Sequence, residues 1–129
     1  MKTLITSVFF TLIAVYAKGQ NLSLDSSIIG VWKGTSLCQQ KNSSCHDEVA
    51  VYYIVRASGV DTFNIDGKRI VNGQEIDMGI LGCKLDRKNK RLLSTTYGLW
   101  TFNFKGNVLD GTLYQNGELF RIIKLTKMK

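Results

Sequence analysis

Short runs of strand-forming residues, separated by turn dipeptides, make up most of this 129-residue sequence. The turns recur about every eight to twelve residues, a spacing that is typical of β-sandwiches and β-barrels. Several turns contain Asn-Gly or Asp-Gly, in which glycine tolerates the positive φ of a two-residue hairpin loop. Proline, which is confined to edges and bulges in sheets, is absent. The sequence therefore predicts an all-β protein connected mainly by hairpins.

The alternation of apolar and polar residues gives the expected strand positions. A short helical turn is expected at 26–29. Strands are expected at 30–36, 48–57, 60–66, 68–71, 75–86, 91–97, 99–105, 108–114 and 118–126. The strand at 68–71 is the shortest, and its pattern is the weakest. Asp66-Gly67 is predicted to form a tight turn. The apolar phase changes beside Gly79 and Gly82, which predicts a bulge or a barrel corner.

The facing of segment 48–57 is predicted from its charged residues. Glu48 and Arg56, near the two ends of the segment, lie on the same parity. Because that parity is expected to face water, the other parity is expected to face the core. The residues expected to point inward are Val49, Val51, Tyr53 and Val55.

Sheet edges favour a closed architecture. An open sheet of short strands would leave two unpaired edges that promote aggregation. Closing the sheet removes them, and about eight strands is the number at which a barrel encloses side chains or one small ligand. We therefore expect an antiparallel up-and-down barrel of about eight strands without a long C-terminal helix. A two-sheet sandwich is the alternative.

Residues 1–19 have the features of an export signal. Lys2 gives a positive start, residues 4–16 form an apolar stretch too short to span a bilayer, and Ala17 and Gly19 are small residues at the positions that a signal peptidase reads. We expect a signal peptide at 1–19 and a single β-barrel domain at 20–129. The protein is then secreted or periplasmic.

Three cysteines, Cys38, Cys45 and Cys83, are available to pair in an oxidising compartment. Cys38 and Cys45 flank the polar run 39–44, which cannot order itself by burying apolar surface. We expect a bridge between these two, with Cys83 left as a buried, unreactive thiol. A bridge from Cys83 to either of the others is the alternative.

The predicted mature chain is moderately basic. Without Lys2 and Lys18 it keeps 15 basic and 10 acidic residues, a net charge of about +5. This excess favours a weak contact with an anionic envelope surface and gives no reason to expect a nucleic-acid partner. The basic residues gather around one turn and near the chain end: Lys84, Arg87, Lys88, Lys90, Arg91, Lys124, Lys127 and Lys129. A solvated hairpin tip would give the same pattern.

Gly30-Val31-Trp32, at the start of the first expected strand, resembles the Gly-x-Trp opening of the lipocalin and fatty-acid-binding-protein superfamily. The resemblance implies a basic residue on the last strand that lies across the tryptophan and closes one barrel end. Arg121 stands where that partner is expected. The chain differs in having a cysteine loop where fatty-acid-binding proteins have two lid helices. It also has Ile123 where their ligand-binding tyrosine would lie.

This resemblance implies a small apolar or amphiphilic ligand in the barrel mouth. Tyr53, Trp100 and Phe102 are the expected walls of such a site. The same aromatic residues could instead fill the core of a short barrel. We expect a monomer that needs no cofactor.

His46 and Glu48 are candidates for a site at the barrel mouth, because they belong to the densest run of reactive residue types. Adjacent strand residues point to opposite faces, so we do not expect a metal there. No phosphate-binding loop, nucleophile elbow or Cys-x-x-Cys motif is present, and we expect no enzyme activity. The alternative functions are an envelope interaction or inhibitor module that uses the loop 37–47, and a small hydrolase that uses His46.

Overall fold

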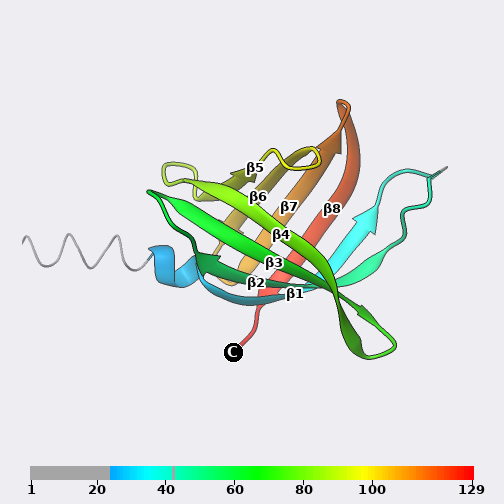
Figure 1. Ribbon diagram of the computed structural model, residues 1–129, viewed down its shortest axis with the longest axis horizontal. Helices are drawn as coiled ribbons and strands as arrows, with labels where there is room; N and C mark the ends of the chain where they lie inside the picture. The colour runs from blue at the N-terminus through cyan, green and yellow to red at the C-terminus, as the bar shows by residue number, and fades with distance from the viewer. Residues whose placement is uncertain (1–23, 42) are drawn as a thin grey trace, which may run out of the picture.

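The structure is a computed structural model that describes residues 24–41 and 43–129, so the signal peptide expected at 1–19 lies outside the described residues. Eight antiparallel strands form a closed barrel, each pairing with the next in sequence, and β8 returns to β1 (Figure 1). The strands are β1 Gly30–Cys38, β2 Glu48–Arg56, β3 Thr62–Val71, β4 Gln74–Asp86, β5 Arg91–Ser94, β6 Leu99–Lys105, β7 Val108–Gln115 and β8 Glu118–Lys127. The predicted eight-stranded barrel is confirmed. In the described part of the chain, no helix is long and apolar enough to cross a membrane.

The barrel has two different ends. A short helix at residues 24–28 lies at one end, which we call the closed end. The connections β1–β2, β3–β4, β5–β6 and β7–β8 lie at the other end, which we call the open end (Figure 1). The predicted Cys38–Cys45 disulfide is present and closes the β1–β2 loop.

Strand β3 runs through Asp66-Gly67, so the tight turn predicted there is wrong. Phe63, Ile65 and Gly67 keep one phase along the strand, and all three are buried. Gly67 instead faces Gly79 on β4. The register between β3 and β4 shifts next to this pair, which confirms the bulge predicted beside Gly79.

The predicted facing of β2 is also wrong. Ala50, Tyr52 and Ile54 point into the barrel and are buried, whereas Val49 and Val55 are exposed. The inward parity includes both charged residues, Glu48 and Arg56. Each lies at a barrel end and has an ion-pair partner there, so a charge on this parity does not mean that the parity faces solvent. Val51 and Tyr53 lie on the opposite parity; Val51 is buried nonetheless.

The closed end is filled and sealed. The largest fully buried side chains include Trp32, Phe63, Phe102, Ile28, Leu92, Leu109, Ile123 and Leu125. The Trp32 ring meets the Phe104 ring edge-on at 5.3 Å, and its indole nitrogen donates a hydrogen bond to the carbonyl oxygen of Ile28 at 2.9 Å. The helix at 24–28 is thereby fixed to the core.

Buried Asp25 anchors the same helix through two arginines. Its carboxylate forms an ion pair with Arg56 and lies 3.0 Å from Arg87. Arg87 also reaches Asp61 at 2.8 Å. Burial opposes ionisation of Asp25, but the hydrogen bonds from Arg87 and Arg56 outweigh it and lower its pKa from the ordinary value.

Candidate functional site

The open half of the barrel contains a cavity of about 260 Å³. Its lining is mostly apolar and comes from β2, β3, β4, β6, β7 and β8 and from the β5–β6 connection: Tyr52, Ile65, Gly67, Met78, Gly79, Ile80, Leu81, Tyr97, Trp100, Leu113 and Arg121. Of these, Met78, Ile80 and Tyr97 are exposed, and they mark the mouth. The cavity lies beyond the packed core of the closed half.

Two facing glycines leave room for this cavity. Gly67 and Gly79 pair across β3 and β4 and contribute no side chain to the wall. A Cβ on Gly67 would make ordinary contacts of 3.7–3.8 Å with its nearest neighbours, so a larger residue fits the backbone there. Its side chain would then occupy space that a ligand needs.

The wall is also incomplete between β4 and β5. Only Lys84, Leu85 and Asp86 of the long β4 pair with β5. Strand β5 ends at Ser94, earlier than predicted, because Tyr97 and Gly98 both adopt positive φ and turn the chain. Residues 74–80 of β4 are consequently exposed, and the cavity mouth opens beside this free edge.

Aromatic side chains form one wall and the floor. Trp100 lines the cavity and stacks on Phe102 at 5.7 Å, and its indole nitrogen donates to the carbonyl oxygen of Thr96 at 2.7 Å. Phe102 is fully buried and packs edge-on against Tyr52 at 5.9 Å. Of the predicted walls, Trp100 therefore borders the cavity directly, while Phe102 supports it from below.

Tyr53 does not line the cavity. It lies on the outer face, where its hydroxyl donates to the Glu75 carboxylate at 2.8 and 2.9 Å. Tyr52, the neighbouring residue, takes the inward position. Burial raises the pKa of Tyr52 far above its ordinary value, so its hydroxyl is neutral in the physiological range.

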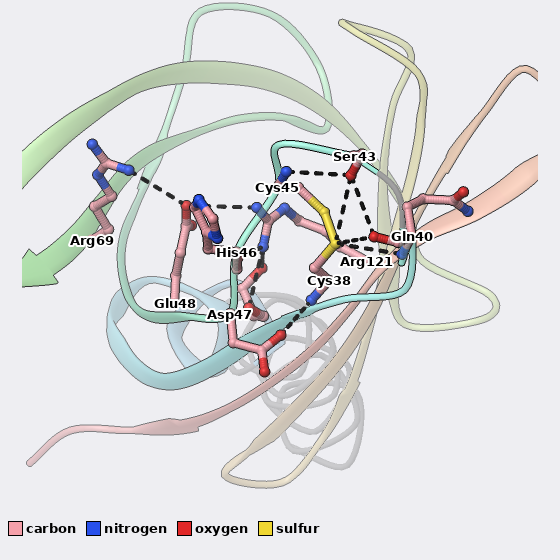
Figure 2. A network of polar contacts seen from close by, with 10 residues as sticks. Cys38, Gln40, Ser43, Cys45, His46, Asp47, Glu48, Arg69 and Arg121 are labelled. Carbon is pink, nitrogen blue, oxygen red and sulfur yellow. Dashed lines mark hydrogen bonds and ion pairs between the residues drawn. A yellow bond between two sulfur atoms is a disulfide. The ribbon is translucent and has the colours of Figure 1, made fainter.

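Arg121 is the charged residue in the cavity lining, and its side chain is only 12% exposed. Its guanidinium donates to the Ser36 carbonyl oxygen and hydroxyl, both at 3.2 Å, and to the His46 carbonyl oxygen at 3.1 Å. It lies 3.5 Å from the Glu48 carboxylate, which is also 3.7 Å from Arg69 (Figure 2). Two guanidinium groups thus share one carboxylate, and the group carries a net positive charge.

The predicted pairing of Trp32 with Arg121 is wrong. Arg121 faces Cys38 across β1 and β8, whereas Trp32 faces Lys127, six residues further along β8. At about 3.3 Å per residue, this separates the two predicted partners by roughly 20 Å. Lys127 closes the barrel instead: its ammonium lies 5.8 Å from the Trp32 ring and donates to the carbonyl oxygens of Ser26 and Ser27 at 2.9 and 3.0 Å.

His46 and Glu48 lie at the open end beside Arg121, but neither is in the cavity lining and they do not form an acid–base pair. Glu48 is directed to the two arginines, and His46 contributes its backbone carbonyl to Arg121 (Figure 2). Within residues 24–41 and 43–129, no group of three His, Cys, Asp or Glu side chains could hold a metal ion. Cys83 is free and buried, and burial raises the pKa of its thiol to about 12, which keeps it protonated and unreactive.

The disulfide loop borders a second, shallower hollow of about 370 Å³ outside the barrel. Its lining residues are Cys38, Gln39, Gln40, Lys41, Cys45, His46 and Asp47. The loop is tied down on both sides: Asp47 accepts a hydrogen bond from the Cys38 backbone at 2.8 Å, and the Gln40 side chain donates to the Leu119 carbonyl oxygen at 2.8 Å. The loop therefore presents a defined surface next to the mouth.

Comparison with known proteins adds no assignment: no protein-family model, no curated protein and no solved structure matches this chain.

Proposed function

We propose that this barrel binds a small acidic amphiphile, with the apolar part in the cavity and the acidic group beside Arg121. The observation that carries the proposal is the position of Arg121, a largely buried guanidinium in an otherwise apolar lining. Ligand sites commonly combine apolar walls with a few polar groups that fix orientation. Arginine is well suited to bind a carboxylate or phosphate through two parallel hydrogen bonds.

The charge balance around Arg121 favours an anion over a neutral head group. Glu48 compensates only one of the two nearby guanidinium groups, Arg69 and Arg121. An incoming carboxylate would supply the missing negative charge in a partly desolvated place, where ion pairing is stronger than in bulk water. A cationic head group would be repelled by the same residues.

The size of the cavity restricts the ligand. A volume of about 260 Å³ lies just below the roughly 300–1,000 Å³ of most small-molecule pockets. A medium-length apolar chain or one small ring system fits this limit, and a longer chain would have to leave through the mouth beside β4. We therefore choose octanoic and decanoic acid as probes, with octanol and decanol as their uncharged counterparts.

Tryptophan fluorescence tests the proposal. Trp100 lines the cavity and Trp32 lies in the closed core, so a ligand in the cavity changes the emission of Trp100. We expect saturable binding of decanoic acid and weaker binding of decanol. In Arg121→Gln, acid affinity falls about tenfold or more, because a hydrogen bond to a charged group is lost, and decanol affinity stays within about twofold of its original value.

Two results would contradict this assignment. One is the absence of any saturable change with either probe series at millimolar concentration. The other is an equal loss of acid and alcohol affinity in Arg121→Gln, which would mean that the variant has merely disturbed the fold. Arg69→Gln is the comparison variant: it removes the same charge from the Glu48 network but no group from the cavity lining, so acid affinity is expected to fall less than in Arg121→Gln.

A second candidate function is recognition of a protein partner by the disulfide loop. The hollow lined by this loop and its ties to β1 and β8 favour that function. Pull-down with the native protein and with a Gln39→Ala/Lys41→Ala variant separates the candidates. Loss of a reproducible partner in this variant, with decanoic acid binding unchanged, would favour the loop over the cavity.

We also propose that the chain is exported and that the mature protein begins near Gln20. The Cys38–Cys45 disulfide is compatible with an oxidising compartment. Mass spectrometry of the protein recovered from the secreting host is expected to show a chain without residues 1–19. Recovery of the full-length chain from the reducing cytosol would contradict export.

A further inference from the structure

The two ends of the barrel differ in charge. At the open end, the carboxylates Asp47, Glu48, Asp66, Glu75, Asp77 and Glu118 outnumber the basic residues Lys41, Lys68, Arg69 and Arg121. At the closed end, the carboxylates Asp25, Asp61 and Asp86 are outnumbered by the basic residues Arg56, Lys84, Arg87, Lys88, Lys90, Arg91, Lys105, Lys127 and Lys129, and the nearby Asp110 is paired with Lys124. The positive charge of the barrel is therefore concentrated at the closed end.

The three carboxylates at this end are already paired with arginines. Asp25 and Asp61 bind Arg87, and Asp86 binds Arg91 at 3.0 Å. Five exposed lysines are left over, and within the described residues none of them forms an ion pair: Lys84, Lys88, Lys90, Lys105 and Lys129. We call these five the basic end surface.

The segments that carry the basic end surface are connected to one another. Backbone hydrogen bonds join Leu85 to Asp61, Phe104 to Lys90, Lys127 to Asn107, and Met128 to Val31. The Lys84 ammonium also donates to the Val60 carbonyl oxygen at 3.3 Å. The segments that carry the lysines are thus joined at one end of the barrel, the end at which the helix lies in Figure 1.

Apolar side chains protrude among these lysines. Val60, in the β2–β3 connection, is 82% exposed, and Met128, after β8, is 49% exposed. A soluble polyanion offers little to such side chains. The interface of a lipid bilayer accepts both, because its head groups attract lysine and its acyl boundary accepts apolar side chains.

We infer that the closed end docks on the surface of a membrane that contains anionic lipids. The lysines of the basic end surface meet the head groups, and Val60 and Met128 enter the boundary below them. The barrel then stands with its mouth facing the aqueous side. This docking is independent of the ligand proposed for the cavity, because the two sites lie at opposite ends.

Vesicle flotation of the mature chain proposed above, which begins at Gln20, tests the inference. One set of vesicles contains phosphatidylcholine with about a third phosphatidylglycerol, and the other contains phosphatidylcholine alone. Because the two sets of vesicles differ only in the charge of the head groups, the difference in binding between them reports on charge. We expect binding to the anionic vesicles only, and loss of that binding in 0.5 M salt, where the Debye length falls below about 5 Å.

Two double variants with the same change of net charge locate the surface. Lys88→Gln/Lys105→Gln removes two lysines from the basic end surface. Each lysine is expected to change partitioning about fivefold, so binding is expected to fall about 25-fold. Lys41→Gln/Lys124→Gln removes two lysines from elsewhere and is expected to change binding less than threefold. Equal losses in the two variants would overturn the inference.

Val60→Ser distinguishes a membrane from a soluble polyanion. It removes protruding apolar surface without changing charge, and we expect it to weaken vesicle binding while leaving heparin binding unchanged. If heparin binds the protein as tightly as the anionic vesicles do and Val60→Ser has no effect on either, the partner is a polyanion and the membrane inference fails. Near-native circular dichroism of each variant is the control for folding.

Discussion

The two halves of this barrel are built from the same eight strands, yet they differ in what fills them. In the closed half, Trp32 is fully buried against Phe104, and Asp25 and Lys127 tie the helix at 24–28 to the strands. In the open half, Gly67 and Gly79 leave space, and β5 is too short to cover β4. We infer that the two halves have different roles: the closed half stabilises the fold, and the open half provides the cavity for a ligand.

The largest expected difference between the halves is the cost of removing a tryptophan. Trp32→Ala empties a fully buried site and is expected to lower the free energy of unfolding by about 3–5 kcal/mol. Trp100→Ala is expected to cost about 1–2 kcal/mol, because one side of that ring borders the cavity. Urea denaturation measures both. Similar costs for the two variants would mean that the open half is packed as well as the closed half.

The Asp25 ion pairs are expected to contribute less, and in a pH-dependent way. Asp25→Asn is expected to cost about 1–2 kcal/mol at pH 7, because both arginines are partly exposed to solvent. The pKa of Asp25 is lower in the folded protein than its ordinary value of 3.8. Its stabilisation is therefore complete above that value and is lost as the pH falls through the folded pKa.

This linkage gives a measurement with a defined sign. Unfolding of the native protein and of Asp25→Asn is followed by urea denaturation between pH 7 and pH 2.5. The stability difference is expected to be constant down to about pH 5 and to shrink below pH 4. A difference that grows on acidification would show that Asp25 is not an ionised partner of the arginines.

The smallest expected effect on stability comes from filling the cavity. Gly67→Val adds a side chain to the wall and, since strand glycines are entropically costly, is expected to change the free energy of unfolding by less than about 1 kcal/mol. Decanoic acid binding is expected to fall at least about tenfold, because the added methyl groups overlap the ligand. Gly82→Val is the matched control: Gly82 faces Asn64 on the outside of the barrel, so binding should not change.

The strand pattern of this protein could be predicted from its sequence, because turn dipeptides and alternation are local. Even the bulge beside Gly79 left a local sign, a change of apolar phase. The turn predicted at Asp66-Gly67 does not form. The dipeptide allows a hairpin, but β3 continues through it, because Phe63 and Ile65 lie on the buried face of one long strand. The local preference for a turn is outweighed where the neighbouring side chains of the strand are buried in the core.

The site was harder to predict because it depends on facing and on long-range register. Tyr52 and Tyr53 are identical neighbours, and the charges at the ends of β2 suggested the wrong one of them. Arg121 and Lys127 both lie on β8, and only the pairing of β8 with β1 decides which cation meets Trp32. In β6, the alternation of Trp100, Phe102 and Phe104 with polar residues correctly indicated which side chains face inward. Trp100 was predicted as a wall of the cavity in this way.

The indole signals of the two tryptophans provide the most direct test that the closed half stabilises the fold and the open half binds the ligand. In a nitrogen–proton correlation spectrum, Trp32 and Trp100 give separate indole resonances, assigned with Trp100→Phe. On titration with decanoic acid, the Trp100 resonance is expected to shift to saturation while that of Trp32 stays in place. Equal shifts of both resonances, or no shift of Trp100 at millimolar acid, would contradict a ligand cavity confined to the open half.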